Sequence, residues 1–278
     1  MLPSSFPSLS TTSTEKQYLA YPAGHIARIE ASFQQIEAVS NDESIKTVMI
    51  NLDDAEALLR RGIDSSCFRD DKQVITTSTI NDNILPLYHL EKEAEIVSNF
   101  MPTFHIPSDK PVYLSQSKNE RLWNIQCQVN DTINLRILLN NTPVMLIPLL
   151  KGINYEEILA SYLPMRREGF AAFSYYAAQY FGNGRGNFRN VLLKDVKLIS
   201  QLPSLAYLLL IGVESRNLLG RMPEIVKAHA GNRYIRENCW RKPVPDFHRQ
   251  ADLFKFQFND ASSNIKSAER DSFEQEGS

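Results

Sequence analysis

The sequence lacks the patterns that mark several common functional classes. Its cysteines, Cys67, Cys127 and Cys239, lie far apart and form no CxxC pair, which argues against a disulfide framework and a structural zinc site. The five histidines show no HxH, HxxxH or HExxH spacing, so nothing in the sequence asks for a metal or another cofactor. A GxSxG elbow is also missing, which argues against a serine hydrolase.

Long apolar runs and a strong net charge are missing too. No run approaches 18 apolar residues, so the sequence offers no candidate membrane span. The first residues lack the basic region and apolar core of a secretory signal, and we expect a cytoplasmic protein with reduced cysteines. Because the net charge is −2, there is no overall field that attracts nucleic acid, and any polyanion site has to be a local patch.

The two ends of the chain differ in composition from its centre. Residues 1–16 are rich in Ser, Thr and Pro, and we expect them to be flexible. Residues 258–278 are polar and are expected to form a disordered tail. Residues 17–257 then remain for one folded domain, a length that suits a single large α/β barrel.

What the sequence does contain is an alternation of short apolar runs and amphipathic segments of helix length. Continuously apolar runs in such an alternation indicate parallel strands buried on both faces. The expected strands are residues 48–52, 73–77, 84–90, 104–109, 144–150, 170–176, 207–213 and 234–239. The expected helices include residues 24–39, 53–62, 91–99 and 119–139. The count predicts a (β/α)₈ TIM-type barrel, and the absence of a GxGxxG turn argues against a doubly wound sheet.

Chemistry in a parallel barrel collects where the strands end, so polar residues at those points are candidate site residues. His105 and Asp109 lie where one expected strand meets its loop. A carboxylate there can accept hydrogen bonds from a ring N–H and an exocyclic amine, which suits a purine-like base. The alternative is that Asp109 caps the turn before Lys110 and Pro111.

Lys151 directly follows the expected strand 144–150, where it can face a phosphate or a substrate carbonyl. Gly152 allows the backbone to approach a ligand closely. The alternative is an ordinary turn with an exposed lysine. Tyr175 and Tyr176 end the following strand and offer a wall for a planar ligand, although aromatic residues at such positions more often serve packing.

Two segments carry candidate anion contacts. Residues 182–188 form the one glycine-rich loop, in which Arg185 adds a charge to a possible nest of backbone N–H groups, unless the loop is a simple connection. Residues 233–242 are the most basic segment, and Arg236 is its candidate phosphate contact. The alternative for Arg236 is a solvated face with salt bridges to Glu214 or Glu237.

The order and spacing of these pieces resemble the tRNA-guanine transglycosylase family, particularly its relatives that insert 7-deazaguanine bases into DNA. The resemblance covers roughly residues 100–242. The matching segments are Phe104-His-Ile-Pro-Ser-Asp109, Leu149-Leu-Lys-Gly152, Gly169-Phe-Ala-Ala-Phe-Ser-Tyr-Tyr176, Leu210-Ile-Gly-Val-Glu-Ser-Arg-Asn-Leu218 and Gly231-Asn-Arg-Tyr-Ile-Arg-Glu-Asn238. The family's Gln-Gly-Gly turn reads Leu-Lys-Gly here, its paired glycines read Ser-Tyr-Tyr, and its zinc-binding cysteines are absent.

The resemblance implies a (β/α)₈ barrel that exchanges or recognises a guanine or 7-deazaguanine base in DNA or tRNA. Asp109 then grips the base, Glu237 is the nucleophile beside Arg236, and Asp64 is the acid or base. Arg236 stands where the family has its nucleophilic aspartate. The alternative is a catalytically silent barrel that binds nucleic acid or partner proteins of a base-modification system.

Overall fold

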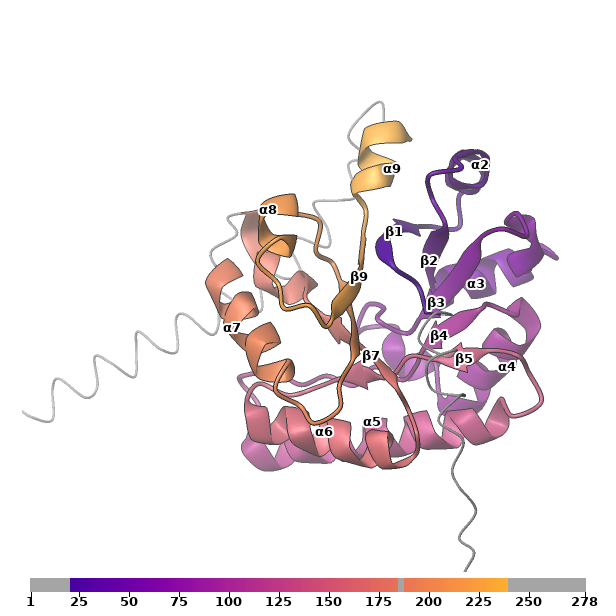
Figure 1. The fold of residues 1–278 in the computed structure, drawn as a ribbon. Coiled ribbons are helices and arrows are strands. Elements are labelled where there is room, and N and C mark those ends of the chain that lie inside the picture. The colour runs from indigo at the N-terminus through magenta and orange to yellow at the C-terminus, as the bar shows by residue number, and fades with distance from the viewer. Residues whose placement is uncertain (1–20, 185–187, 240–278) are drawn as a thin grey trace, which may run out of the picture.

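Parallel strands form a single sheet that curls into a barrel (Figure 1). The computed structural model describes residues 21–184 and 188–239. The strands are β1 (Gly24–Ile29), β2 (Thr47–Asn51), β3 (Gln73–Thr77), β4 (Phe104–Ile106), β5 (Met145–Leu146), β6 (Leu149–Leu150), β7 (Ala172–Tyr176), β8 (Tyr207–Ile211) and β9 (Val226–Gly231). Their order in the sheet is β5-β4-β3-β2-β1-β9-β8-β7-β6.

The barrel closes through a strand that is interrupted once. Only Ile147 and Pro148 separate β5 from β6, which stand at the two ends of the sheet order. Pro148 has no N–H to give to a ladder, which explains the break. On either side the pairing continues, because Ile147 N–H donates to the His105 carbonyl at 2.8 Å and Ser174 N–H donates to the Pro148 carbonyl at 2.8 Å. Counted as one strand, β5 and β6 complete the eight strands of a TIM-type barrel, which confirms the predicted fold.

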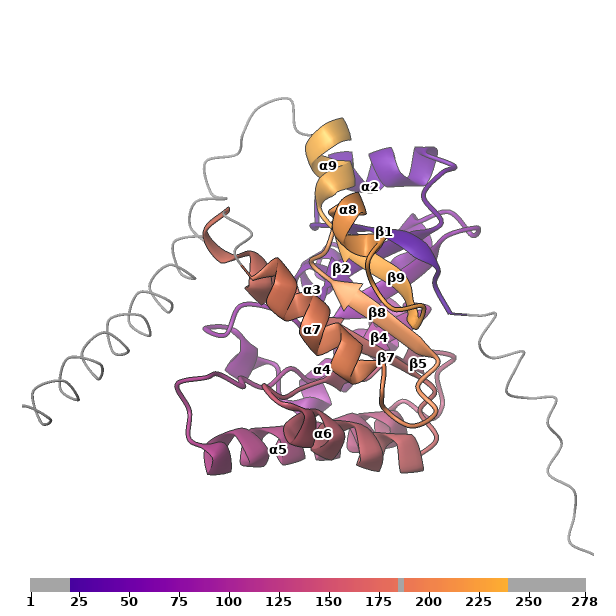
Figure 2. The same cartoon turned by 60° about the vertical axis from the view of Figure 1, so that its left-hand side comes forward.

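Helices surround the sheet, and the turned view brings α7 and α8 forward (Figure 2). The helices and helical turns are α2 (Phe33–Asn41), α3 (Leu52–Leu59), η1 (Ser65–Cys67), η2 (Leu85–Leu87), α4 (Leu90–Phe100), α5 (Lys118–Leu138), α6 (Tyr155–Arg167), η3 (Ala178–Gly184), α7 (Arg189–Ile199), α8 (Arg216–Leu219) and α9 (Arg233–Asn238). The longest, α5, begins at a capping box in which Ser117 and Glu120 satisfy each other's backbone N–H groups. It lies beside α6 in both views.

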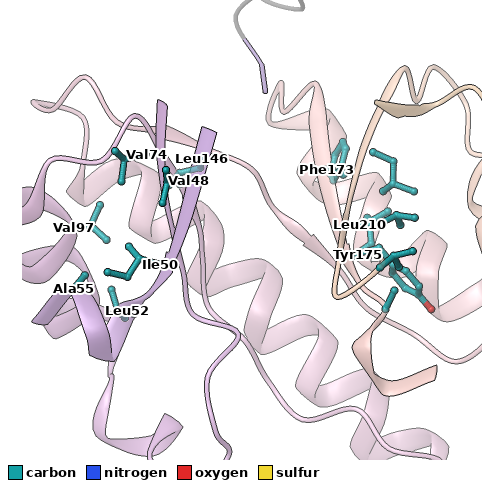
Figure 3. Packing of buried hydrophobic residues seen from close by; sticks show 14 of the residues in the cluster. Val48, Ile50, Leu52, Ala55, Val74, Val97, Leu146, Phe173, Tyr175 and Leu210 are labelled. Atoms are coloured by element: carbon teal, nitrogen blue, oxygen red, sulfur yellow. The ribbon is translucent and has the colours of Figure 1, made fainter. Parts of the chain in front are cut away.

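Most strands bury both of their faces, which explains their apolar runs. One face fills the inside of the barrel with side chains such as Ile26, Met49 and Phe104. The other face packs against the helices, and Figure 3 shows two groups of this outer layer, one around Ile50 and the other around Phe173. The interior is therefore a packed core, and a polar ligand can reach only its ends.

Two secondary-structure predictions for the first half of the chain were wrong. Residues 24–39 were expected to form a helix, but they form β1 followed by a turn and α2. In β1, Ile26 faces the barrel interior while Ala27 and Ile29 face the outer layer, and apolar residues on both faces blur the period of two. Residues 84–90 were expected to form a strand, but they contain the helical turn η2, with Pro86 inside it.

The last expected strand was also wrong. Residues 234–239 lie in and just after the helix α9, so Arg236 and Glu237 belong to a helix and not to a strand. The strand that completes the barrel is β9, whose inward residues Ala228 and Ala230 are small. Its sequence is Val-Lys-Ala-His-Ala-Gly, in which Val226 is the only β-branched residue and no large apolar side chain follows. Such a sequence gives little indication of a strand. The expected flexible residues 1–16 and tail 258–278 lie outside the described residues.

Candidate functional site at the barrel mouth

The carboxyl ends of the strands meet at one end of the barrel, which we call the mouth. The inward side chains there are polar, whereas those deeper in the barrel are apolar. Arg28 follows Ile26 on the inward face of β1, and its Nη2 donates to Asn51 Oδ1 at 2.7 Å. The same nitrogen donates to the Thr79 carbonyl at 3.2 Å, which links the ends of β1, β2 and β3. These contacts fix a guanidinium directly above the apolar core.

Asp109 and Lys151 form an ion pair at the mouth. Asp109 belongs to the loop after β4, and Lys151 follows β6 directly. Their side chains are 11% and 16% exposed. Burial raises the pKa of the Asp109 carboxyl above its ordinary value, although the charge of Lys151 opposes that rise. The pair is therefore a carboxylate and an ammonium group held side by side with little access to water.

Gly152 explains how the chain leaves Lys151. Its φ of +142° lies outside the range that other residues adopt readily. A Cβ there would lie 2.6 Å from Ile158 N and 2.7 Å from Glu157 Cβ at the start of α6. The close approach predicted for Gly152 thus exists, but it is to the following helix. It turns the chain sharply after Lys151.

Tyr113 and Asp82 add a second carboxylate and a phenol. The Tyr113 hydroxyl donates to Asp82 Oδ2, which connects the loop after β3 to the loop after β4. Asp82 is exposed and acts electrostatically on Asp109, whose pKa it raises. Burial raises the pKa of Tyr113, and the hydrogen bond to Asp82 acts in the same direction. Both carboxylates thus share the same side of the mouth.

Tyr176 completes this group from β7. Its ring packs against the interior of the barrel. Burial raises the pKa of Tyr176, Asp109 acts in the same direction, and Arg28 opposes it. We call the following set the mouth cluster: Arg28, Asn51, Asp82, Asp109, Tyr113, Lys151 and Tyr176. It joins two carboxylates, two cations, two phenols and an amide.

The structure brings together three residues that the sequence singled out, namely Asp109, Lys151 and Tyr176. Tyr175 points to the outer layer, where its hydroxyl lies 2.7 Å from that of Tyr180. Tyr180 in turn donates to Asp195 Oδ2 at 2.5 Å, so this chain of hydrogen bonds joins η3 to α7. Tyr175 therefore does not face the mouth.

His105 also lies on the outer side of its strand. It is fully buried between β4 and α4, where its Nε2 lies 2.8 Å from Glu93 Oε1. Its Nδ1 lies 2.8 Å from the Thr76 hydroxyl. The inward neighbours of His105 are Phe104 and Ile106, so the imidazole does not reach the mouth.

The residues assigned to catalysis by resemblance do not join Asp109. Asp64 lies in a loop between α3 and β3, at the opposite end of the barrel, where it caps η1 through Ser66 N–H at 2.8 Å. Glu237 lies on α9 and pairs with Arg233 at 2.7 Å. Arg236 pairs with Glu214, which is one of the two salt bridges that the alternative interpretation offered, whereas Glu237 pairs with Arg233. Arg185 lies outside the described residues.

Sequence reasoning missed Arg28, Asn51, Asp82 and Tyr113. Arg28 stood inside an expected helix, where a charged residue is ordinary. Once residues 24–29 are recognised as a strand, a cation at an inward position near the end of that strand indicates a site residue. Asp82 and Tyr113 lie in loops whose course depends on tertiary contacts, and no local pattern distinguishes them.

A cavity lies at the end of the barrel opposite the mouth. It measures about 530 Å³ and is lined mainly by apolar atoms of residues such as Tyr21, Tyr207 and Ile225. The rings of Tyr21 and Tyr207 pack there at a tilt, with centroids 5.2 Å apart. Because barrel chemistry collects at the carboxyl ends of strands, we place the candidate site at the mouth.

Neither protein-family models nor curated proteins give a match to this chain. Among residues 21–184 and 188–239, no group of three or more His, Cys, Asp or Glu side chains is arranged to hold a metal ion. No helix in that same part of the chain is long and apolar enough to cross a membrane.

Proposed function

We propose that the mouth cluster binds a guanine-type base, as in the transglycosylase family that the sequence resembles. The observation that carries the proposal is the ion pair of Asp109 and Lys151. Guanine presents, along one edge, a carbonyl oxygen, a ring N–H and an exocyclic amine. An ammonium group beside a carboxylate offers a donor for the carbonyl oxygen and the lone pairs of a carboxylate as acceptors for the N–H groups.

The same geometry argues against an adenine-type base. Adenine places an amine where guanine has its carbonyl oxygen and an unprotonated ring nitrogen where guanine has its N–H. Lys151 would then face a donor, and Asp109 would face an acceptor. Buried polar groups left unpaired cost binding free energy, so the pair is expected to select guanine.

Exposed apolar side chains on the loops around the mouth support a base that is part of a nucleic acid. Leu87, Leu114 and Ile153 come from the loops after β3, β4 and β6, which also surround Asp109 and Lys151. Leu114 is 75% exposed. A nucleotide turned out of its stack leaves unstacked neighbours, which apolar side chains can cover.

Base exchange is the second candidate function, and the position of Asp82 favours it. Exchange needs a carboxylate oxygen to attack the anomeric carbon of the sugar while the bond to the base breaks and the base takes up a proton. The incoming base then displaces the carboxylate and loses its own proton. We assign the attack to Asp82, because it shares the mouth with Asp109 whereas Glu237 pairs with Arg233 on α9.

Binding is tested by calorimetry with free guanine and adenine. We expect guanine to bind at least about tenfold more tightly than adenine, and Asp109→Asn to weaken guanine binding by roughly tenfold to a hundredfold. Asp71→Asn is the matched control, because Asp71 lies in a loop at the opposite end of the barrel and pairs with Lys46. Equal binding of the two bases, or no binding, would overturn the proposal.

Exchange is tested separately with labelled 7-deazaguanine and either DNA or tRNA. Incorporation that is lost in Asp82→Asn and kept in Glu237→Gln supports exchange through Asp82. The reverse pattern returns the nucleophile to Glu237. Guanine binding without incorporation into either polymer identifies a silent barrel that recognises the base without exchanging it.

A further inference from the structure

A buried carboxylate behind β3 and β4 contacts the loop that carries Asp109. Glu93 on α4 is 3% exposed. Its Oε1 accepts hydrogen bonds from Ser108 N–H at 2.9 Å and from the Ser78 hydroxyl. Its Oε2 accepts from the Ser108 hydroxyl at 3.1 Å. One carboxylate therefore connects the residues that follow two neighbouring strands.

His105 holds this carboxylate from the other side. Its Nε2 lies 2.8 Å from Glu93 Oε1, and its Nδ1 contacts the hydroxyl of Thr76. Burial alone would raise the pKa of Glu93, but the hydrogen bonds from His105, Ser78 and Ser108 hold it below its ordinary value. Glu93 is thus an ionised acceptor whose orientation is fixed by several donors.

The hydrogen bonds to Glu93 coincide with an unusual backbone conformation. Ser108 has a φ of +46°, which residues other than glycine adopt uncommonly. Both its N–H and its hydroxyl are bound to Glu93. Because Ser108 directly precedes Asp109, its φ and ψ angles decide where the Asp109 side chain points.

Glu93 and Asp109 are also neighbours across a small cavity. The cavity measures about 30 Å³, enough to hold a water molecule, and Ser78, Glu93, Ser108 and Asp109 all contribute to its walls. A shift of the Ser108 backbone would therefore move Asp109 without a tightly packed wall to resist it.

We propose that Glu93, oriented by His105, is a positioning residue that aims Asp109 at both N–H groups of a guanine-type base. This inference rests on the proposed function. Glu93 would then determine the selection of guanine over hypoxanthine. Hypoxanthine keeps the carbonyl oxygen and the ring N–H of guanine but lacks its exocyclic amine. A correctly aimed carboxylate accepts two hydrogen bonds from guanine and one from hypoxanthine.

The test compares the two bases in calorimetry with the full chain and its variants. We expect the parent to bind guanine roughly tenfold more tightly than hypoxanthine, and Glu93→Gln to lower this ratio to below about threefold. Glu95→Gln is the matched control, because Glu95 is an exposed glutamate on the same helix, and it should keep the parent ratio. Equal weakening of both bases in Glu93→Gln, with the ratio unchanged, would reduce Glu93 to a structural role and overturn the inference.

A measurement without ligand separates this inference from the proposed function. Amide hydrogen exchange at Ser108 and Asp109 should be faster in Glu93→Gln than in the parent and unchanged in Glu95→Gln. If the parent binds no guanine but exchange rises at these two amides, the proposed function fails while the positioning by Glu93 stands. Unchanged exchange at both amides contradicts the positioning directly.

A milder variant guards against a Glu93→Gln protein that does not fold. Ser108→Gly adopts the same backbone angles without strain and removes the hydroxyl bond to Glu93. We expect it to fold and to lose part of the discrimination between guanine and hypoxanthine. A folded Ser108→Gly that keeps the full ratio and the parent's amide exchange overturns the contribution of the hydroxyl bond, and the N–H bond that the variant retains is then tested by Glu93→Gln alone.

Discussion

The mouth holds its charges in two different ways. Where β4 and β6 end, the Asp109 and Lys151 side chains are 11% and 16% exposed, and each is the other's charge partner. Where β8 and β9 end, Arg236 and Glu237 are 48% and 58% exposed, and they pair with Glu214 and Arg233, which are 19% and 40% exposed. Exposed pairs contribute little to stability, whereas breaking a buried pair leaves an uncompensated charge. Burial, more than the density of charge in the sequence, therefore distinguishes the candidate site.

The largest effect is expected from Lys151→Met. The change leaves the Asp109 carboxylate buried without its cation, and we expect the free energy of unfolding at pH 7 to fall by about 3 kcal/mol. The pKa of Asp109, already raised by burial, should rise further, so the loss should shrink as the pH falls and the carboxyl becomes protonated. Urea denaturation at pH 7 and pH 4 measures both effects.

The control for this prediction is Lys46→Met. Lys46 pairs with Asp71 at 3.7 Å on the exposed opposite end of the barrel. Its loss should change stability by less than about 0.5 kcal/mol. Equal effects of the two substitutions would remove the difference between buried and exposed charges on which the comparison depends.

A partly buried carboxyl near the mouth, that of Asp54, predicts a pH dependence. Burial raises the pKa of Asp54 to about 6, although the hydrogen bond from Ala31 N–H opposes that rise. A raised pKa in the folded state means that ionisation of Asp54 disfavours folding. The free energy of unfolding should therefore fall as the pH rises from about 4, the ordinary pKa of an aspartate, through 6. Asp54→Asn should remove about 2 kcal/mol of this fall, as measured by urea denaturation across that range. A variant with the parent's pH profile would contradict the prediction.

A smaller effect is expected from Tyr113→Phe, which removes the hydroxyl that donates to Asp82. Because Tyr113 is half-buried and Asp82 is exposed, the free energy of unfolding should fall by about 1 kcal/mol. If Asp82 attacks the sugar, the loss of this donor should also change the pH dependence of base incorporation. Tyr155→Phe, on α6, is the control for removing a hydroxyl from a partly buried tyrosine.

The barrel could be predicted from the sequence because its strands are buried on both faces. The runs that became β2, β7 and β8 are continuously apolar, and the long helix α5 has a clear capping box. The ends of the barrel were harder to predict. In β1, the apolar residues on both faces imitate a helical pattern, and β9 relies on small alanines that carry no strand signal.

The candidate site was predictable only in part, for a related reason. Asp109 and Lys151 follow strongly apolar strands, so their place at the mouth could be inferred from the chain order. Whether a residue at a strand end faces inward depends on the register of that strand. This is why Tyr176 reaches the mouth cluster while its neighbour Tyr175 packs outside. The role of Glu93 depends on contacts between α4 and two loops, which no local pattern records.

The smallest effect is expected from Arg236→Gln. The segment is the most basic in the sequence, yet Arg236 is half exposed and already paired with Glu214. Its replacement should change the free energy of unfolding by less than about 1 kcal/mol, with a smaller difference in high salt. If Arg236 instead contacts a phosphate, the variant should bind nucleic acid more weakly and with a salt dependence reduced by about one phosphate contact. Unchanged nucleic-acid affinity would leave this arginine as the ion-pair partner of Glu214 alone and would confine the recognition of the base to the buried side of the mouth.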